Sequence, residues 1–267
     1  MIVVINRLKL IILCALLAFI ALNPSSAIKG AAAGIELCVK AIIPSMLPFM
    51  VIVQVLRNSG LYFPPMIGGF LCGFPNGAIM TQELYNVGKI KKDRFQKLAV
   101  ISNNASIGFV FAAVGIGIYH SIKVGWLLFG AQVITALIMT LFLGLRKSER
   151  PSIIKETSKV NAFRTISIYL AIVCTTVIFF SSIIYILNSL HIPFFLTSLI
   201  EITNGIAFVP PLPFAAFLLG FGGFATAAQT FAVCSSLNKK QYIFLKLLQG
   251  IICGFLVYLA EIILHFI

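Results

Sequence analysis

The sequence predicts an all-α, polytopic integral membrane protein. Of its 267 residues, 60% are hydrophobic and only 10% are charged, and the mean hydropathy is +1.06. Soluble domains carry about 25% charged residues, so lipid must solvate much of this apolar surface. Glycine and proline interrupt two apolar segments, and part of the sequence repeats. These features predict two re-entrant helical hairpins in an inverted repeat.

Apolar runs and helix breakers predict the elements in chain order. The first run, 8–23, lies within an N-terminal segment, 1–30, that fits either a retained membrane helix or a signal peptide; a retained helix is favoured because later spans hold the chain in the membrane. The next predicted spans are 31–57, 97–119, 122–145, 165–190 and 242–266. A shorter piece, 194–209, ends at Pro210.

Two basic clusters orient these spans. They are Lys89, Lys91, Lys92, Arg94 and Lys97, and then Arg146, Lys147, Arg150, Lys155 and Lys159. Clusters at the ends of apolar runs are typical of cytoplasmic loops, so 146–164 is predicted to be a basic cytoplasmic loop. This placement also argues against nucleic-acid binding as the reason for the net charge of +13.

The segment 62–87 must leave from and return to the cytoplasmic side, which predicts the first hairpin. About 13 residues per arm at 1.5 Å each reach about 20 Å, near the midplane of a 30 Å core. Gly73, Pro75 and Gly77 would cost a continuous helix several kcal/mol at about 1 per glycine and 3 per proline. A chain break at this point removes most of that cost; one kinked span is the alternative.

A shift of 147 positions aligns 70–78 with 217–225, which predicts a second hairpin at 213–237. The chain then consists of one repeat at 31–145 and another at 165–267, inverted as in many secondary transporters. Inversion in this register places Lys239 and Lys240 outside, against the charge rule. If 194–209 crosses the membrane, these lysines return inside and the second hairpin is not inverted; both arrangements stay open.

Polar groups and irregular backbone inside a membrane are expensive, so they are candidate solute ligands. Their alternative role is helix–helix hydrogen bonding. The candidates lie at both hairpin tips, on the outgoing arms and in the next span. They are Gly73, Pro75, Asn76, Gly77, Gln82, Asn103, Asn104, Gly220, Gly222, Gly223 and Gln229.

Glu201, with Thr203 and Asn204, is a candidate site for a coupling cation or proton, and capping of a helix is the alternative role. The spacings of metalloproteases, serine hydrolases and P-loop enzymes do not occur in the sequence. We therefore expect no enzyme activity, no catalytic residue, no metal site and no cofactor.

Several motifs, in order along residues 35–266, resemble the nucleoside-recognition GATE domain of sporulation membrane proteins. They are Ile43–Phe49, Gly69–Ala78, Glu83–Tyr85, Ser102–Asn104, Leu199–Gly205, Leu219–Gly223 and Lys246–Gly250. The chain departs from the pattern at Phe224–Thr226, where a more polar stretch is expected. The resemblance implies a fold related to concentrative nucleoside transporters, with paired hairpins forming the solute site. It also implies a role in sporulation.

Together, these features predict a multi-pass protein of the cell membrane that transports a small polar, nucleoside-like solute or an ion. Its expected partners are membrane lipid, the solute, and a coupling cation or proton; homo-oligomerisation stays open. The alternative is a scaffold, without transport, for assembly of the spore envelope. The scaffold hypothesis gives weight to the loop 146–164, and the transport hypothesis to the hairpin residues.

Overall fold

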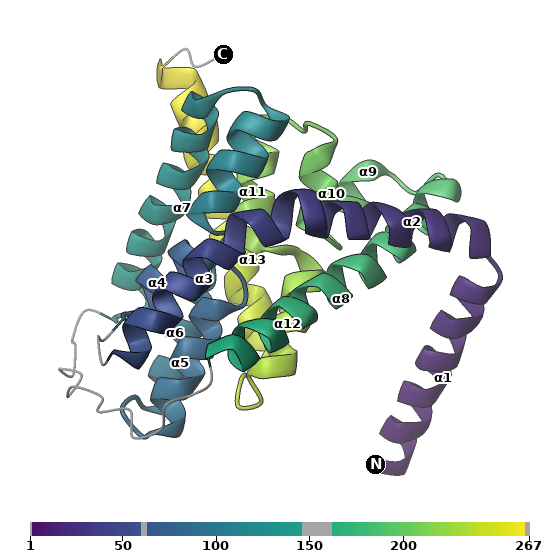
Figure 1. Ribbon diagram of the computed structural model, residues 1–267, viewed down its shortest axis with the longest axis horizontal. Helices are drawn as coiled ribbons and strands as arrows, with labels where there is room; N and C mark the ends of the chain where they lie inside the picture. The colour runs from purple at the N-terminus through teal and green to yellow at the C-terminus, as the bar shows by residue number, and fades with distance from the viewer. Residues whose placement is uncertain (1, 60–62, 146–161, 265–267) are drawn as a thin grey trace.

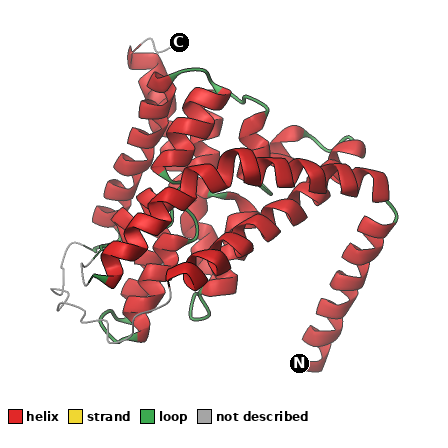
Figure 2. Cartoon of the chain, viewed as in Figure 1, coloured by secondary structure: helices red, strands yellow, loops and turns green. Residues whose placement is uncertain are grey.

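The computed structural model describes residues 2–59, 63–145 and 162–264, and in these residues every regular element is a helix (Figure 2). Most of the predicted basic loop, 146–161, lies outside the described residues. Five helical segments are long and apolar enough to cross a membrane: Pro24–Asn58, Ile122–Phe142, Phe163–Ser189, Leu212–Val233 and Lys239–Ile263. The predicted all-α, polytopic class is therefore confirmed.

The N-terminal helix α1 (Ile2–Ala21) extends away from the remaining helices (Figure 1). A long helical run follows, made of α2 (Pro24–Leu37), the π-helix η1 (Cys38–Ile42) and α3 (Ile43–Asn58). The π-helical turn directly precedes Pro44, whose missing N–H already disturbs the regular bonding pattern. Gly30 and Gly34 let α2 pack closely on α8 (Ala162–Ser189), since a Cβ on Gly30 would lie 2.6 Å from the Ser181 carbonyl oxygen.

The first predicted hairpin corresponds to α4 (Pro65–Cys72) and α5 (Asn76–Asn86), which fold back on one another. The turn between them contains Gly73 at φ +76° and a cis Phe74–Pro75 bond. Gly69 and Gly77 face each other across the pair and leave room for the Ser102 carbonyl oxygen. A Cβ on either glycine would lie 1.7–1.8 Å from that oxygen.

The predicted span 97–119 is interrupted. Helix α6 (Lys92–Ile101) ends, residues 102–106 are non-helical, and the chain continues as the π-helix η2 (Phe109–Ile118). The sequence predicts one continuous helix here. Side chains of distant helices instead bond two backbone groups of the unwound segment: Lys246 donates to Asn103 O, and Gln132 accepts from Ala105 N. Helix α7 (Ile122–Phe142) follows and packs on η2.

The second half begins with the long helix α8 (Ala162–Ser189). Two short helices, α9 (Phe194–Ser198) and α10 (Ile202–Ala207), then pack on one another with Gly205 against Ser198. Five and six residues at 1.5 Å each are too short to cross a 30 Å core. The piece 194–209 is thus a short returning pair.

The segment predicted as the second hairpin contains α11 (Leu212–Phe221) and α12 (Gly223–Val233). These helices do not return on one another but run end to end as Leu212–Val233, interrupted at Gly222 (Figure 1). Gly222 ends α11 in the left-handed region, at φ 85°, and the chain continues onward. The predicted hairpin at 213–237 is therefore corrected to an interrupted helix, which α13 (Lys239–Leu264) follows.

The same order of elements thus occurs twice: a long helix, a returning pair, an interrupted helix and a second long helix. In this order α11 and α12 correspond to α6 and η2, whereas the 147-residue shift aligned them with α4 and α5. Contacts show which loops share an end of the molecule. Gln96 bonds Ser236 O and Asn238 N at one end, and the Tyr119 hydroxyl donates to Pro210 O at the other.

Candidate functional site

Four chain interruptions meet in the interior. They are 73–75 between α4 and α5, 102–106 between α6 and η2, 199–201 between α9 and α10, and Gly222 between α11 and α12. Gly73 lies against Ser106, and Gly222 against the Phe74 ring. The Phe224 and Ala225 N–H groups donate to Leu199 O and Ile200 O at 2.9 and 2.8 Å. Each interruption therefore contacts at least one other.

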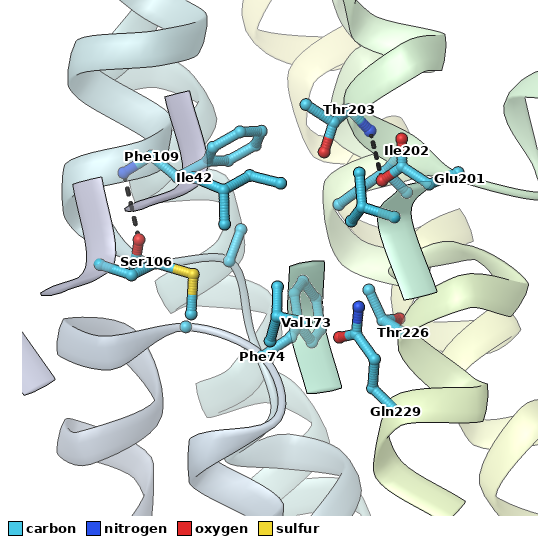
Figure 3. A pocket seen from close by; sticks show the side chains of 14 residues that line it. Ile42, Phe74, Ser106, Phe109, Val173, Glu201, Ile202, Thr203, Thr226 and Gln229 are labelled. Atoms are coloured by element: carbon cyan, nitrogen blue, oxygen red, sulfur yellow. Dashed lines mark hydrogen bonds between the residues drawn. The ribbon is translucent and has the colours of Figure 1, made fainter. Parts of the chain in front are cut away.

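A partly open cavity of about 40 Å³ lies beside these interruptions (Figure 3). Helices from both halves contribute polar side chains to its wall: Ser106, Glu201, Thr203, Thr226 and Gln229. The remaining wall is largely apolar and includes Ile42, Phe74, Phe109 and Val173. The cavity therefore has the mixed lining that is typical of small-ligand sites, in which a few polar groups orient the ligand.

Glu201 is the acidic residue of this wall, and it is 1% exposed. Its carboxylate accepts hydrogen bonds from the Thr203 and Asn204 N–H groups at 3.0 and 2.8 Å and from the Asn204 side chain at 2.8 Å. Glu201 is thus the N-cap of α10, as the alternative role predicts. It also lines the cavity, so both roles are compatible.

Gln229 brings an unsatisfied polar atom to the same cavity. Its amide nitrogen donates to Thr176 Oγ1 at 2.7 Å, while Oε1 is buried and has no hydrogen-bond partner among the residues that the structure describes. A buried carbonyl oxygen without a partner costs about 1–3 kcal/mol. Water, a cation or a solute donor in the cavity would offset this cost.

The size of the cavity limits what it can hold in this conformation. One water molecule needs about 10–15 Å³ of such space, so 40 Å³ fits a few waters or one small cation. Sites for drug-sized ligands usually measure about 300–1,000 Å³. A nucleoside would enter only after the surrounding helices moved apart.

The cavity adjoins larger grooves on one side. A groove of about 580 Å³ shares Phe109 and Thr203 with the cavity wall, and another of about 310 Å³ includes Asn204. Leu37 and Lys40 line both grooves. On the side of Arg57, the pocket that contains Asn76 measures only about 20 Å³. The two sides of the cavity are therefore unequally open.

A second polar cluster lies where α13 packs on the unwound residues 102–106. The Asn103 amide donates to Tyr242 Oη at 2.7 Å and to Thr230 Oγ1 at 2.9 Å. The Lys246 ammonium donates to Asn103 O at 2.8 Å, and the Gln249 amide donates to Asn104 Oδ1 at 2.7 Å. One face of α13 thus bonds to both asparagines.

The structure separates the predicted site residues into groups. Gly73, Gln229, Glu201 and Thr203 line the cavity. Asn103 and Asn104 belong to the cluster on α13. The other predicted residues lie outside the cavity wall, in packing positions or in neighbouring pockets: Pro75, Asn76, Gly77, Gln82, Asn204, Gly220, Gly222 and Gly223.

Several residues that the sequence analysis did not select belong to these sites. Phe74, Ser106 and Thr226 line the cavity, whereas Tyr242, Lys246 and Gln249 form the cluster on α13. Lys246 had a detectable signal, because a lysine inside a predicted span is a functional candidate by default. Ser106 and Thr226 had none beyond their polarity, since serine and threonine are common in membrane helices.

Comparison with curated proteins finds similarity to the sporulation integral membrane protein YlbJ of Bacillus subtilis (strain 168). The two chains are 24% identical over 131 residues, which cover 41% of this chain and 32% of the relative. The match thus covers less than half of either protein. No family model matches the chain, and no solved structure matches it. With the five candidate spans, this similarity identifies a multi-pass integral membrane protein.

Proposed function

We propose that this protein is a permease for a small polar solute or a cation, and that the cavity between the four interruptions is its transport site. The proposal rests on one observation. The buried carboxylate residue Glu201 and Gln229, whose side-chain oxygen has no hydrogen-bond partner in the described residues, line the same cavity. Interrupted helices expose backbone groups that are tolerated in membranes where they line a cavity.

When α11 and α12 are matched with α6 and η2, the arrangement of the loops supports an inverted architecture. With the end that carries Lys91 and Lys240 in the cytoplasm, α4 and α5 return to the inside, and α9 and α10 return to the outside. The chain crosses inward through α11 and α12, so Lys239 and Lys240 obey the charge rule. The conflict in the 147-residue register then disappears, while the two halves keep opposite orientations.

The unequal grooves support access from the outside. In this orientation the two large grooves open on the outer side of the cavity, and the small pocket with Asn76 lies on the inner side. A cation or a few waters fit the cavity as it stands, whereas a nucleoside-like solute requires the halves to separate. The cation thus needs the smaller conformational change, and Glu201 supplies the negative charge that favours it.

Transport by purified protein in liposomes tests the proposal. The probes are tritiated uridine and radioactive sodium, measured in parallel against empty liposomes. We expect uptake of at least one probe, and at least a tenfold loss in the Glu201→Gln variant, because this change removes the buried charge. The variant also weakens the cap of α10, by about 0.5–2 kcal/mol, so its folded fraction is measured by size-exclusion chromatography.

Asp93→Asn is the matched control, since Asp93 is an exposed carboxylate paired with Lys97 outside the cavity wall. It should transport as the unmodified protein does. If neither probe enters liposomes above the empty control, the transport proposal fails for these two solute classes. If Glu201→Gln transports normally, the proposed site is wrong.

The similarity to YlbJ favours a role in sporulation, and the scaffold hypothesis shares this role. Complementation separates the two. In a spore-forming host that lacks this protein, Glu201→Gln should fail to restore heat-resistant spores if transport is required. Full restoration by a transport-dead variant would favour the scaffold.

A further inference from the structure

Lys246 is a lysine buried in an apolar helix, 1% exposed. It lies seven residues after the start of α13 at Lys239, or about 10 Å along the helix axis. In the described part of the chain no carboxylate lies within 4.0 Å of its ammonium group. Transfer of an unpaired ammonium group out of water costs several kcal/mol, so other groups must stabilise its charge.

Three groups surround the ammonium. It donates hydrogen bonds to Asn103 O at 2.8 Å and to Gln249 Oε1 at 3.0 Å. It also lies over the Phe74 ring, 5.2 Å from the centroid. Two neutral oxygens and an aromatic face are ligands that suit a monovalent cation.

The position of Asn103 offsets part of the cost of burying a positive charge there. Helix α6 ends at Ile101, and the C-terminus of a helix carries partial negative charge on its unpaired carbonyl groups. Phe74 belongs to the turn between α4 and α5. The ammonium therefore contacts two interruptions of the first half of the molecule, and joins them to α13.

We propose that Lys246 is a tethered cation, which fills a site that would otherwise take a free monovalent cation. Its ammonium holds the Asn103 carbonyl group and the Phe74 ring in place, so the first half needs no bound ion to stabilise its unwound segment. Any coupling cation then binds at Glu201 in the second half. This inference goes beyond the proposed function, since it depends on burial and geometry and holds whether or not the protein transports.

Removal of the side chain tests this inference directly. Lys246→Ala leaves a space with Asn103 O and Gln249 Oε1 at its far end, which a small cation can enter. The midpoint of thermal unfolding is measured on the purified full chain in detergent, at constant ionic strength, in choline chloride, sodium chloride or ethylammonium chloride. Choline is too bulky to reach the space and serves as the inert cation.

In choline chloride we expect Lys246→Ala to unfold at a lower temperature than the unmodified protein. Sodium or ethylammonium should raise the midpoint of the variant in a saturable manner, because a ligand that binds only the folded state stabilises it. Any sodium that binds at Glu201 should raise the midpoints of the variant and the unmodified protein alike, so the test is the additional rise that the variant alone shows. Lys240→Ala, an exposed lysine on the same helix, should behave as the unmodified protein does.

Two results overturn the inference. One is a Lys246→Ala variant whose midpoint responds to the three salts as that of the unmodified protein does. The other is a Lys246→Gln variant as stable as the unmodified protein, since glutamine keeps a donor of similar length but has no charge. The second variant decides the question if Lys246→Ala does not fold. None of these outcomes depends on uptake, so failure of the transport proposal is recognised separately.

Discussion

Two buried charges of opposite sign lie near the interruptions, and each is stabilised by backbone groups. The Glu201 carboxylate accepts two N–H bonds from the first turn of α10, and the Lys246 ammonium donates to a carbonyl group beyond the last turn of α6. Helix termini favour these signs of charge. Partners of this kind are fixed by the backbone, so each charge can be buried although neither forms an ion pair within the described part of the chain.

Gln229 provides a prediction at the scale of one residue. Gln229→Leu removes the unsatisfied oxygen and the bond to Thr176. The net effect on stability should be small, because the lost hydrogen bond is worth about 1 kcal/mol and the unsatisfied oxygen disappears as well. Uptake of the transported probe should fall at least tenfold, since the cavity loses an acceptor.

Uptake into proteoliposomes and the thermal midpoint are measured on the same preparation. Gln241→Leu is the matched control, because Gln241 is not part of the cavity wall. Normal uptake by Gln229→Leu would show that this oxygen does not contact the solute.

At the scale of elements, the pairing of the short helices α4 and α5 depends on close contact between backbones. The Ser102 carbonyl oxygen lies between α4 and α5 where Gly69 and Gly77 leave space. This contact joins the returning pair to the interrupted helix that follows. Small residues allow such approach in membrane proteins, where packing replaces the hydrophobic effect.

Gly77→Ala should destabilise the protein by about 1–3 kcal/mol or more, the usual range for overpacking. The added Cβ would lie 1.8 Å from the Ser102 carbonyl oxygen, and backbone must move to admit it. Gly130→Ala is the control, because a Cβ there meets no described residue within 4 Å and alanine favours the helix α7. Thermal unfolding in detergent measures both; equal midpoints would contradict the observed packing.

The elements differ in how far the sequence predicts them. Gly73, Pro75 and Gly77 mark the first turn because these residue types break helices wherever they stand. The interruption at 102–106 was missed, because it is stabilised by Lys246 and Gln249, more than 140 residues away in the chain. Gly222 was recognised as a break but assigned to a hairpin. A left-handed glycine ends a helix without specifying whether the chain returns or continues.

The candidate site was predicted only in part for the same reason. Glu201 and Gln229 are conspicuous as polar residues in apolar segments, and both line the cavity. Asn103 and Asn104 are equally conspicuous, yet they bond to α13 instead. Polarity in a membrane segment indicates that a partner exists, while the identity of that partner depends on tertiary packing.

At the scale of the whole molecule, the described helices after α1 form two halves with the same order of elements, and the cavity lies where their interruptions meet. If the halves are inverted in the membrane, each end of the cavity is controlled by one returning pair: α4 and α5 toward the inside, α9 and α10 toward the outside. Such an arrangement permits access from either side by movement of one half against the other.

Labelling of single cysteines in intact cells, in a variant without the native cysteines, tests this arrangement most directly. We expect Lys91→Cys and Lys240→Cys to react only with a membrane-permeant reagent, and His120→Cys and His191→Cys to react with an impermeant one. All four positions are exposed. Reaction of Lys240→Cys from the side opposite to Lys91→Cys would contradict the paired inversion, and with it the transport site between the halves.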